Sequence, residues 1–117
     1  MHEFCNSRDP GVDLNYLKDF STDSKSLQAF AYKLLGDTYG DLNKNEDAVE
    51  YYDKAGHCFQ EDESQSAEAL FRAGLKSEVM GKTDKAINYY KEIKEKFPRT
   101  DRGFQIDKYL ARLGVTE

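Results

Sequence analysis

Apolar residues recur every three to four positions along most of this chain, the spacing that places side chains on one face of an α-helix. Segment 46–59 shows the pattern clearly, because Ala48, Tyr52, Ala55 and Phe59 follow one another at helical intervals. Short polar or glycine-containing stretches separate this segment from others like it. The pattern predicts an all-α fold of about five to six helices. Their expected ranges are 13–20, 26–40, 46–59, 67–80, 84–97 and 101–113.

Residues that start or stop helices stand near several of these boundaries. Asn45 is an expected N-cap, because its side chain can accept a hydrogen bond from the first turn. The polar stretch 60–65 predicts a loop, with Ser64 or Ser66 capping the helix that follows. Gly81 predicts a helix end, since glycine adopts the left-handed conformation found there without steric cost.

The chain also repeats itself. Residues 46–55 read EDAVEYYDKA and residues 84–93 read DKAINYYKEI, 38 positions later. The matching positions are mostly small or aromatic, and they include Gly36 with Gly74, Ala48 with Ala86, Tyr52 with Tyr90 and Phe59 with Phe97. A period in this range indicates stacked helical hairpins and not a globular bundle.

The repeated glycines and tyrosines predict how the helices of each hairpin meet. Gly36 and Gly74 lie in the middle of expected helices, where glycine costs about 1 kcal/mol relative to alanine. A neighbouring helix is therefore expected to approach closely at both positions. Tyr52 and Tyr90 are expected to fill the remaining space in the core, with their hydroxyl groups near solvent.

These positions resemble the pattern of the tetratricopeptide repeat (TPR) family. The first repeat matches the pattern at Tyr32, Leu35, Gly36, Tyr39, Ala48, Tyr52 and Ala55. The second repeat matches it at Leu70, Ala73, Gly74, Ala86, Tyr90, Ile93 and Pro98. The chain departs from the pattern at Ser77, where tyrosine is usual, and at Leu70, where a larger aromatic residue is usual. Its period exceeds the family's repeat of about 34 residues, which we assign to additional residues in the acidic loop 60–65.

The resemblance implies a right-handed solenoid of antiparallel helix pairs that has no chemistry of its own. It also implies an organisation of the chain. A flexible leader is expected over 1–12 and a single TPR-like domain over 13–117, composed of a half repeat 13–20, repeat one 29–60, repeat two 67–98 and a C-terminal capping helix 101–113. The final segment is similar to that of uncharacterised TPR proteins of Bacteroidota, in which a membrane-anchored portion often precedes the repeats. The chain is accordingly expected to be the C-terminal part of a longer bacterial protein.

The resemblance further implies that a peptide or protein partner binds the concave face formed by the first helix of each pair. The positions expected on that face are Phe30, Lys33 and Asp37 in the first repeat and Phe71, Leu75 and Glu78 in the second. Phe71 and Leu75 allow two interpretations: they grip a peptide, or they pack against another helix, such as the C-terminal one. The second is favoured, because apolar stripes at helical spacing are usually core. A clamp for a partner's terminal carboxylate is not expected, since Asp37 stands where an asparagine is needed.

Composition and charge exclude several other functions. The net charge is −5 and the sequence pI is near 5.1, which does not favour nucleic acid as a partner. No apolar run approaches the roughly 20 residues of a membrane span, so direct insertion of this segment is not expected. The chain is expected to be a soluble domain on the cytoplasmic or periplasmic side of a membrane. The sequence contains no glycine-rich phosphate loop and no nucleophile motif.

The cysteines and histidines do not form a site in the sequence. Cys5 and Cys58 are far apart, and the adjacent His57 and Cys58 point roughly 100° apart on a helix. No metal, cofactor or catalytic activity is therefore expected. The function predicted is a non-catalytic interaction scaffold. The alternative is self-assembly into a homodimer through the uncovered half repeat at 13–20.

Overall fold

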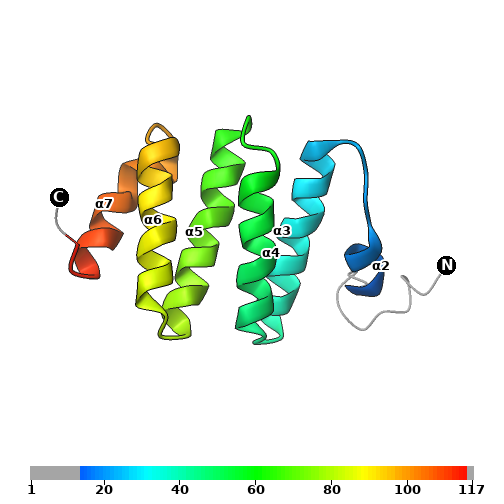
Figure 1. Ribbon diagram of the computed structural model, residues 1–117, viewed down its shortest axis with the longest axis horizontal. Helices are drawn as coiled ribbons and strands as arrows, with labels where there is room; N and C mark the ends of the chain where they lie inside the picture. The colour runs from blue at the N-terminus through cyan, green and yellow to red at the C-terminus, as the bar shows by residue number, and fades with distance from the viewer. Residues whose placement is uncertain (1–13, 116–117) are drawn as a thin grey trace.

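The computed structural model of the chain describes residues 14–115, so the expected leader at 1–12 lies outside the described residues. The described part contains six α-helices and no strand. They are α2 (Leu14–Asp19), α3 (Lys25–Asp41), α4 (Asn45–Cys58), α5 (Glu63–Val79), α6 (Thr83–Lys96) and α7 (Asp101–Arg112). Each helix packs against the next along the chain, so the helices form a row (Figure 1). The prediction of an all-α solenoid of helical hairpins is confirmed.

The 38-residue period appears in the helix boundaries themselves. The first helices of the two pairs, α3 and α5, begin 38 residues apart and end 38 residues apart, and the second helices, α4 and α6, do the same. The turn between the helices also repeats. Asn43 and Gly81 occupy equivalent positions, and both have positive φ angles, of 63° and 77°. The residue after each donates a backbone hydrogen bond to the last turn of the first helix, which ends that helix in the manner expected for Gly81.

The start of α5 differs from the prediction. The helix begins at Glu63 and not at residue 67, and the Asp62 side chain accepts a hydrogen bond from the Gln65 backbone as its cap. Ser64 and Ser66, our expected caps, lie inside the helix, and the buried Ser66 hydroxyl donates to the carbonyl oxygen of Phe59. Both first helices have 17 residues, and the loop between α4 and α5 comprises residues 59–62, so the rest of the expected loop 60–65 belongs to α5.

The start of α4 also differs in detail. Asn45 is the first helical residue, and Lys44 occupies the cap position without a side-chain hydrogen bond to the helix. The acidic residues Glu46 and Asp47 lie in the first turn. Negative charge at that end stabilises a helix through its dipole, so these acids contribute there although Asn45 does not act as the cap.

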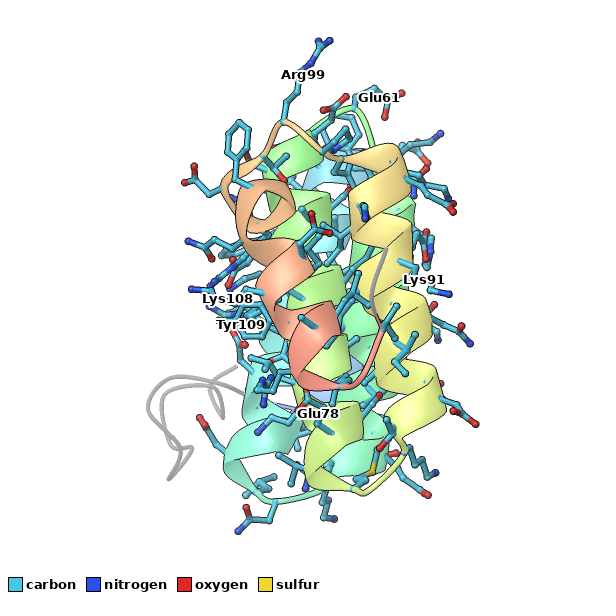
Figure 2. All side chains as sticks on the ribbon, turned by 90° about the vertical axis from the view of Figure 1, so that its left-hand side faces the viewer. Glu61, Glu78, Lys91, Arg99, Lys108 and Tyr109 are labelled. Atoms are coloured by element: carbon cyan, nitrogen blue, oxygen red, sulfur yellow. The ribbon has the colours of Figure 1, made fainter. Side chains whose placement is uncertain are left out.

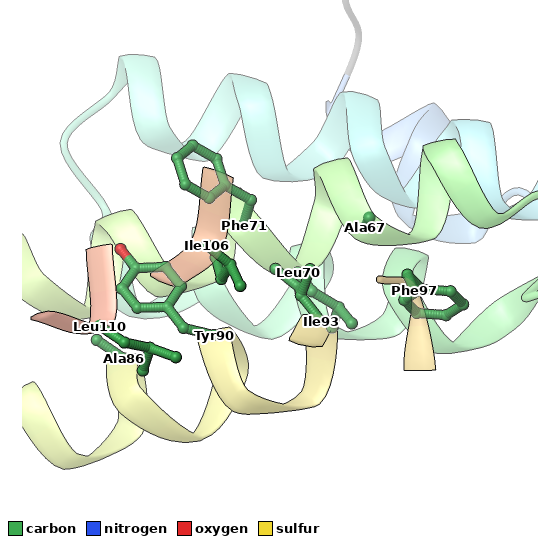
Figure 3. Close-up of a cluster of buried hydrophobic side chains, with 9 residues drawn as sticks. All are labelled: Ala67, Leu70, Phe71, Ala86, Tyr90, Ile93, Phe97, Ile106 and Leu110. Atoms are coloured by element: carbon green, nitrogen blue, oxygen red, sulfur yellow. The ribbon is translucent and has the colours of Figure 1, made fainter. Parts of the chain in front are cut away.

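The buried residues form two clusters, one for each hairpin. The first, around Leu35 and Tyr52, joins α3 and α4 to α5. The second, around Leu70, Tyr90 and Ile106, joins α5, α6 and α7 (Figure 3). The core therefore continues along the row of helices, because α5 contributes side chains to both clusters.

The close approach predicted at the repeated glycines is confirmed. A Cβ atom added to Gly36 would lie 2.6 Å from Tyr52 Cδ1, and one added to Gly74 would lie 2.5 Å from Tyr90 Cε1. Each tyrosine ring therefore lies directly against the helix backbone, which leaves no space for a side chain. The two hydroxyl groups lie in partly buried surroundings, where each has a carboxylate partner. The Tyr52 hydroxyl donates to Asp37, and the Tyr90 hydroxyl donates to Glu78 at 2.5 Å.

Candidate functional site

The exposed side of α3, α5 and α7 carries a ladder of alternating charges. We call this side the first-helix face. Lys33 lies 3.2 Å from Asp37 on α3, and Asp37 lies 2.8 Å from Arg72 on α5. Arg72 also binds Glu68 at 2.9 Å, and Glu68 binds Arg102 of α7 at 2.8 Å. The ladder thus links three successive first helices. Each partly exposed pair contributes up to about 1 kcal/mol, but together they hold the side chains in place.

The neighbouring groups favour the ionised forms of Glu68 and Arg72. Partial burial acts to raise the pKa of Glu68, but hydrogen bonds from Arg102 and Arg72 hold that pKa below its ordinary value. For Arg72, partial burial acts to lower the pKa, yet the bond to Glu68 and the charge of Asp37 raise it above the ordinary value. Burial, followed by the hydrogen bond to Asp37, raises the pKa of Tyr52, so this hydroxyl stays protonated and remains a donor.

Two grooves adjoin on the first-helix face. The first, of about 120 Å³, lies between α3 and α5, and Ala55 of α4 and the residue after that helix, Phe59, contribute to its lining. Phe30, which is 58% exposed, also lines it. The second groove, of about 380 Å³, lies between α5 and the start of α7 and is lined in part by Glu68, Arg72 and Arg102 of the ladder. Lys33 and Gln65 line both grooves. An apolar pocket and a charged groove are therefore next to each other on the same face.

The residues predicted for partner binding divide into two groups. Phe30 and Lys33 line the grooves, and Asp37 belongs to the ladder. Phe71 is buried, with only 3% of its surface exposed, and Leu75 packs against the same core cluster. The first group faces solvent, and the second belongs to the packing of the solenoid.

Phe71 is covered by α7. The Tyr109 ring lies edge-on at 4.9 Å from the Phe71 ring, and the Arg102 guanidinium lies 4.1 Å from the centre of the same ring. Glu78, another predicted binding residue, accepts a hydrogen bond from Arg112 of α7 at 3.0 Å. Figure 2 shows Tyr109 on one side of the molecule and Lys91 of α6 on the other. The C-terminal helix therefore packs against Phe71. This agrees with the favoured interpretation, in which Phe71 packs against another helix and does not grip a peptide.

Arg72 and Arg102 were not among the residues expected at the site. One signal was present, because Glu68 and Arg72 are four residues apart, the spacing of helical ion pairs. The contact between Arg102 and Glu68 joins residues 34 positions apart, and no local pattern indicates it.

The opposite side of the molecule, formed by α4 and α6, has a second polar cluster. His57 Nδ1 lies 2.8 Å from the Asp53 carbonyl oxygen, and its Nε2 lies 2.7 Å from Glu92 Oε2. Tyr89 donates to the Asp53 carboxylate at 2.7 Å, and Lys96 binds Glu92 at 3.0 Å. Both ring nitrogens of His57 face acceptors, and only the doubly protonated ring can donate from both. When His57 is protonated, it can therefore link α4 and α6 through both ring nitrogens.

We expect the protonation of His57 to add stability at low pH. Partial burial acts to lower the pKa of His57, but hydrogen bonds to Glu92 and to the Asp53 carbonyl outweigh it and raise the pKa in the folded state. Such a group stabilises the fold fully below its unfolded pKa of about 6.5, and the effect is lost as pH rises through the folded value. The difference should stay within about 1 kcal/mol, because the pair is partly exposed.

Urea unfolding of the wild type and of His57→Gln, measured from about pH 5.5 to about pH 9, checks this expectation. The stability difference between the two proteins should be largest at the acidic end and should shrink as the pH rises. Parallel pH profiles for the two proteins would contradict it.

Within residues 14–115, no group of three or more histidine, cysteine or acidic side chains is arranged to hold a metal ion. In the same part of the chain, no helix has the length and apolar character needed to cross a bilayer. The Cys58 thiol lies 3.5 Å from the Lys25 carbonyl oxygen, and the His57 ring turns instead to Glu92 on α6. His57 and Cys58 thus have separate surroundings, as their spacing predicts.

Comparison with known proteins gave one family. No curated protein and no solved structure matches the chain. The likeness to TPR proteins of Bacteroidota therefore stays a prediction. One segment of the chain, residues 68–100, matches a family model. This segment contains most of α5, all of α6 and the cap of α7. Residues 68–100 match the family model of the tetratricopeptide repeat, and this match supports placing the chain in the TPR family.

Proposed function

We propose that this protein is a non-catalytic scaffold that binds an extended segment of a peptide or protein on its first-helix face. The TPR match supports a role in protein–protein interaction. The observation that carries the finer proposal is the pair of adjoining grooves, one lined by Phe30 and the other by the charged ladder. An extended chain can place successive side chains in neighbouring grooves of a helical array.

The grooves favour a particular ligand chemistry. The small pocket beside Phe30 suits an aliphatic or aromatic side chain, because Ala29, Ala55 and Ala69 contribute to its lining. The larger groove presents Arg72 and Arg102, whose guanidinium groups are paired with Glu68. A polar segment of the ligand that hydrogen-bonds to the ladder suits this groove better than an apolar one, which would bury the ion pairs.

Peptide selection from a random displayed library tests the proposal. Peptides selected on the wild type should bind at least about tenfold more weakly to Phe30→Glu, because this change places a charge beside the small pocket. Asn88→Glu is the matched control, since it adds the same charge at an exposed position of α6. Equal binding of the selected peptides to both variants would contradict a site on the first-helix face.

The second candidate function is self-assembly into a homodimer through the half repeat. It is favoured by Leu27 of α3, which is 54% exposed. Exposed apolar side chains at the end of a helical array need a cover or a partner. Light scattering on the purified protein over a concentration series tests this candidate, and a constant monomer mass would exclude it.

A further inference from the structure

Two hydrogen-bonded triads, each made of a tyrosine, an acid and an arginine, join successive helix pairs of the solenoid. In the first triad, the Tyr52 hydroxyl of α4 donates to Asp37 of α3, and Arg72 of α5 donates to the same carboxylate at 2.8 Å. The hydroxyl and the guanidinium share one acceptor atom, Asp37 Oδ1. The first triad therefore ties the pair α3 and α4 to the first helix of the next pair.

The second triad has the same geometry one repeat later. The Tyr90 hydroxyl of α6 donates to Glu78 Oε2 of α5 at 2.5 Å, and Arg112 of α7 donates to the same oxygen at 3.0 Å. A carboxylate on a first helix thus again accepts from the tyrosine of its own pair and from an arginine of the next first helix. The two triads provide a matched comparison within one molecule.

Only the tyrosine of each triad follows the 38-residue period. The period carries Asp37 to Leu75 and Arg72 to Leu110, so neither charged residue has a charged equivalent. The acid and the arginine of the second triad come from other positions of their helices. The shared feature of the two triads is therefore a tyrosine hydroxyl that lies beneath a carboxylate.

Tyr52 is the rigid member of the first triad. Its side chain is buried, and its ring lies against the backbone of α3, where a Cβ atom added to Gly36 would be 2.6 Å from Tyr52 Cδ1. The side chains of Asp37 and Arg72 are both partly exposed, and an arginine has several rotatable bonds. Tyr52 therefore gives Asp37 a fixed donor, and Asp37 in turn gives Arg72 a fixed acceptor.

The two triads differ in what they hold in place. Arg72 lines the charged groove of the first-helix face, and so does Lys33, which lies 3.2 Å from the second carboxylate oxygen of Asp37. Within residues 14–115, the lining of the two grooves on this face includes no member of the second triad. Loss of the hydroxyl from the first triad should therefore affect the grooves, and the same loss from the second triad should not.

We propose that Tyr52 is a positioning residue for the first-helix face, although it lies on a second helix and does not line either groove. Its hydroxyl orients Asp37, and Asp37 holds the Arg72 guanidinium in the groove before a ligand binds. An arginine that is already held loses less rotamer freedom on binding, so the ligand binds more tightly. The inference rests on the proposed peptide binding and adds to it a residue that acts through two others.

Tyr52→Phe and Tyr90→Phe are the matched variants, because each removes one hydroxyl from one triad and keeps the ring. NMR of the guanidinium groups measures their effect without any ligand, since rotation about the arginine Nε–Cζ bond slows when the group is held. Tyr52→Phe should speed this rotation at least about threefold for Arg72 and leave Arg112 unchanged, the effect of roughly one hydrogen bond. Unchanged rotation of Arg72 in Tyr52→Phe would overturn the inference.

Asp37→Ala is a second variant at a partly exposed position, and it should free Arg72 in the same way. In the Asp37→Ala background, Tyr52→Phe should have little further effect on the rotation of Arg72, because the hydroxyl acts through Asp37. Effects that add in this double-mutant cycle would overturn the inference. Circular dichroism melts check that every variant is folded at the temperature of the measurements.

The peptides selected on the wild type provide the readout of binding. They should bind about five- to tenfold more weakly to Tyr52→Phe and within about twofold of the wild type to Tyr90→Phe. Equal losses in the two tyrosine variants would indicate a general effect on stability and would contradict a positioning role for Tyr52.

The outcomes separate this inference from the proposed function. If Phe30→Glu binds the selected peptides as well as the wild type does, the proposed site is wrong, and the role of Tyr52 at that site is wrong with it. If Phe30→Glu loses binding while Tyr52→Phe binds like Tyr90→Phe, the peptide site is supported and only the positioning role of Tyr52 is wrong.

Discussion

Phe71→Ala is expected to lower the free energy of unfolding by about 3–5 kcal/mol, the range for removing a buried aromatic side chain. Phe71 is only 3% exposed, and its ring centre lies 5.9 Å from that of Tyr90 and 4.9 Å from that of Tyr109. The Arg102 guanidinium also loses the ring over which it lies. The truncated side chain leaves a cavity between α5, α6 and α7, which the neighbours fill only in part. Urea denaturation monitored by far-UV circular dichroism measures the loss.

The same substitution should act locally on α7. This helix packs on α5 and α6 through the cluster that contains Phe71, Ile106 and Leu110, and ion pairs also hold it to α5. Its amide protons should therefore exchange much faster in the variant than those of α3 and α4. Phe104→Ala is the matched control, because Phe104 is 73% exposed and should cost less than about 0.5 kcal/mol. If Phe71→Ala left the free energy of unfolding and the amide exchange rates unchanged, Phe71 would not be a core residue. The interpretation of Phe71 as a peptide contact would then be favoured.

Gly74→Val is expected to lower the free energy of unfolding by about 2–3 kcal/mol, the range for overfilling a packed core. A Cβ atom at this position would lie 2.5 Å from Tyr90 Cε1. Tyr90 cannot move away easily, because it is fully buried among Leu70, Ile93 and their neighbours. Valine gains some helix propensity over glycine, but that gain is below about 1 kcal/mol and does not offset the clash. Urea denaturation again measures the change.

A double-mutant cycle separates this clash from other effects of valine. In a Tyr90→Leu background the ring is absent, so Gly74→Val should cost clearly less than in the wild type. Asn88→Val, at an exposed position of α6, controls for the intrinsic preference of valine and should stay within about 0.5 kcal/mol. If the losses of stability caused by Gly74→Val and Tyr90→Leu were additive, Tyr90 would not be the obstacle to a side chain at position 74.

Most of the fold could be predicted because its signals are local and are repeated. Ala48, Tyr52 and Ala55 define one helical face, and the same spacing returns 38 residues later, which predicts the hairpins and their order. The glycine–tyrosine contact could also be predicted, since a mid-helix glycine is unfavourable unless a neighbour needs the space. The start of α5 could not be predicted from the sequence, because the acidic, polar stretch 60–65 has the composition of a loop. Asp62 caps the helix, and the packing of Ser66 against the end of α4 decides where it begins.

The candidate site could be predicted only in part. Phe30 and Lys33 follow from the family geometry, and both line the grooves. The ladder through Arg72 and Arg102 joins residues more than 30 positions apart, and a long, flexible arginine side chain can reach several acids from one backbone position. The choice among these acids depends on the distances between α3, α5 and α7, which no single segment of sequence contains.

The sequence by itself determined the helical class, the 38-residue repeat and the tight contact at Gly36 and Gly74, because periodicity and side-chain size act within one or two helices. Only the tertiary structure decided that Phe71 is core and Phe30 is surface, although both are aromatic residues on first helices. It also decided that the tyrosine hydroxyl groups donate to Asp37 and Glu78. The physical reason is the same in each case: burial and hydrogen bonding depend on which helix packs alongside, and α7 covers Phe71 while the face beside Phe30 stays open.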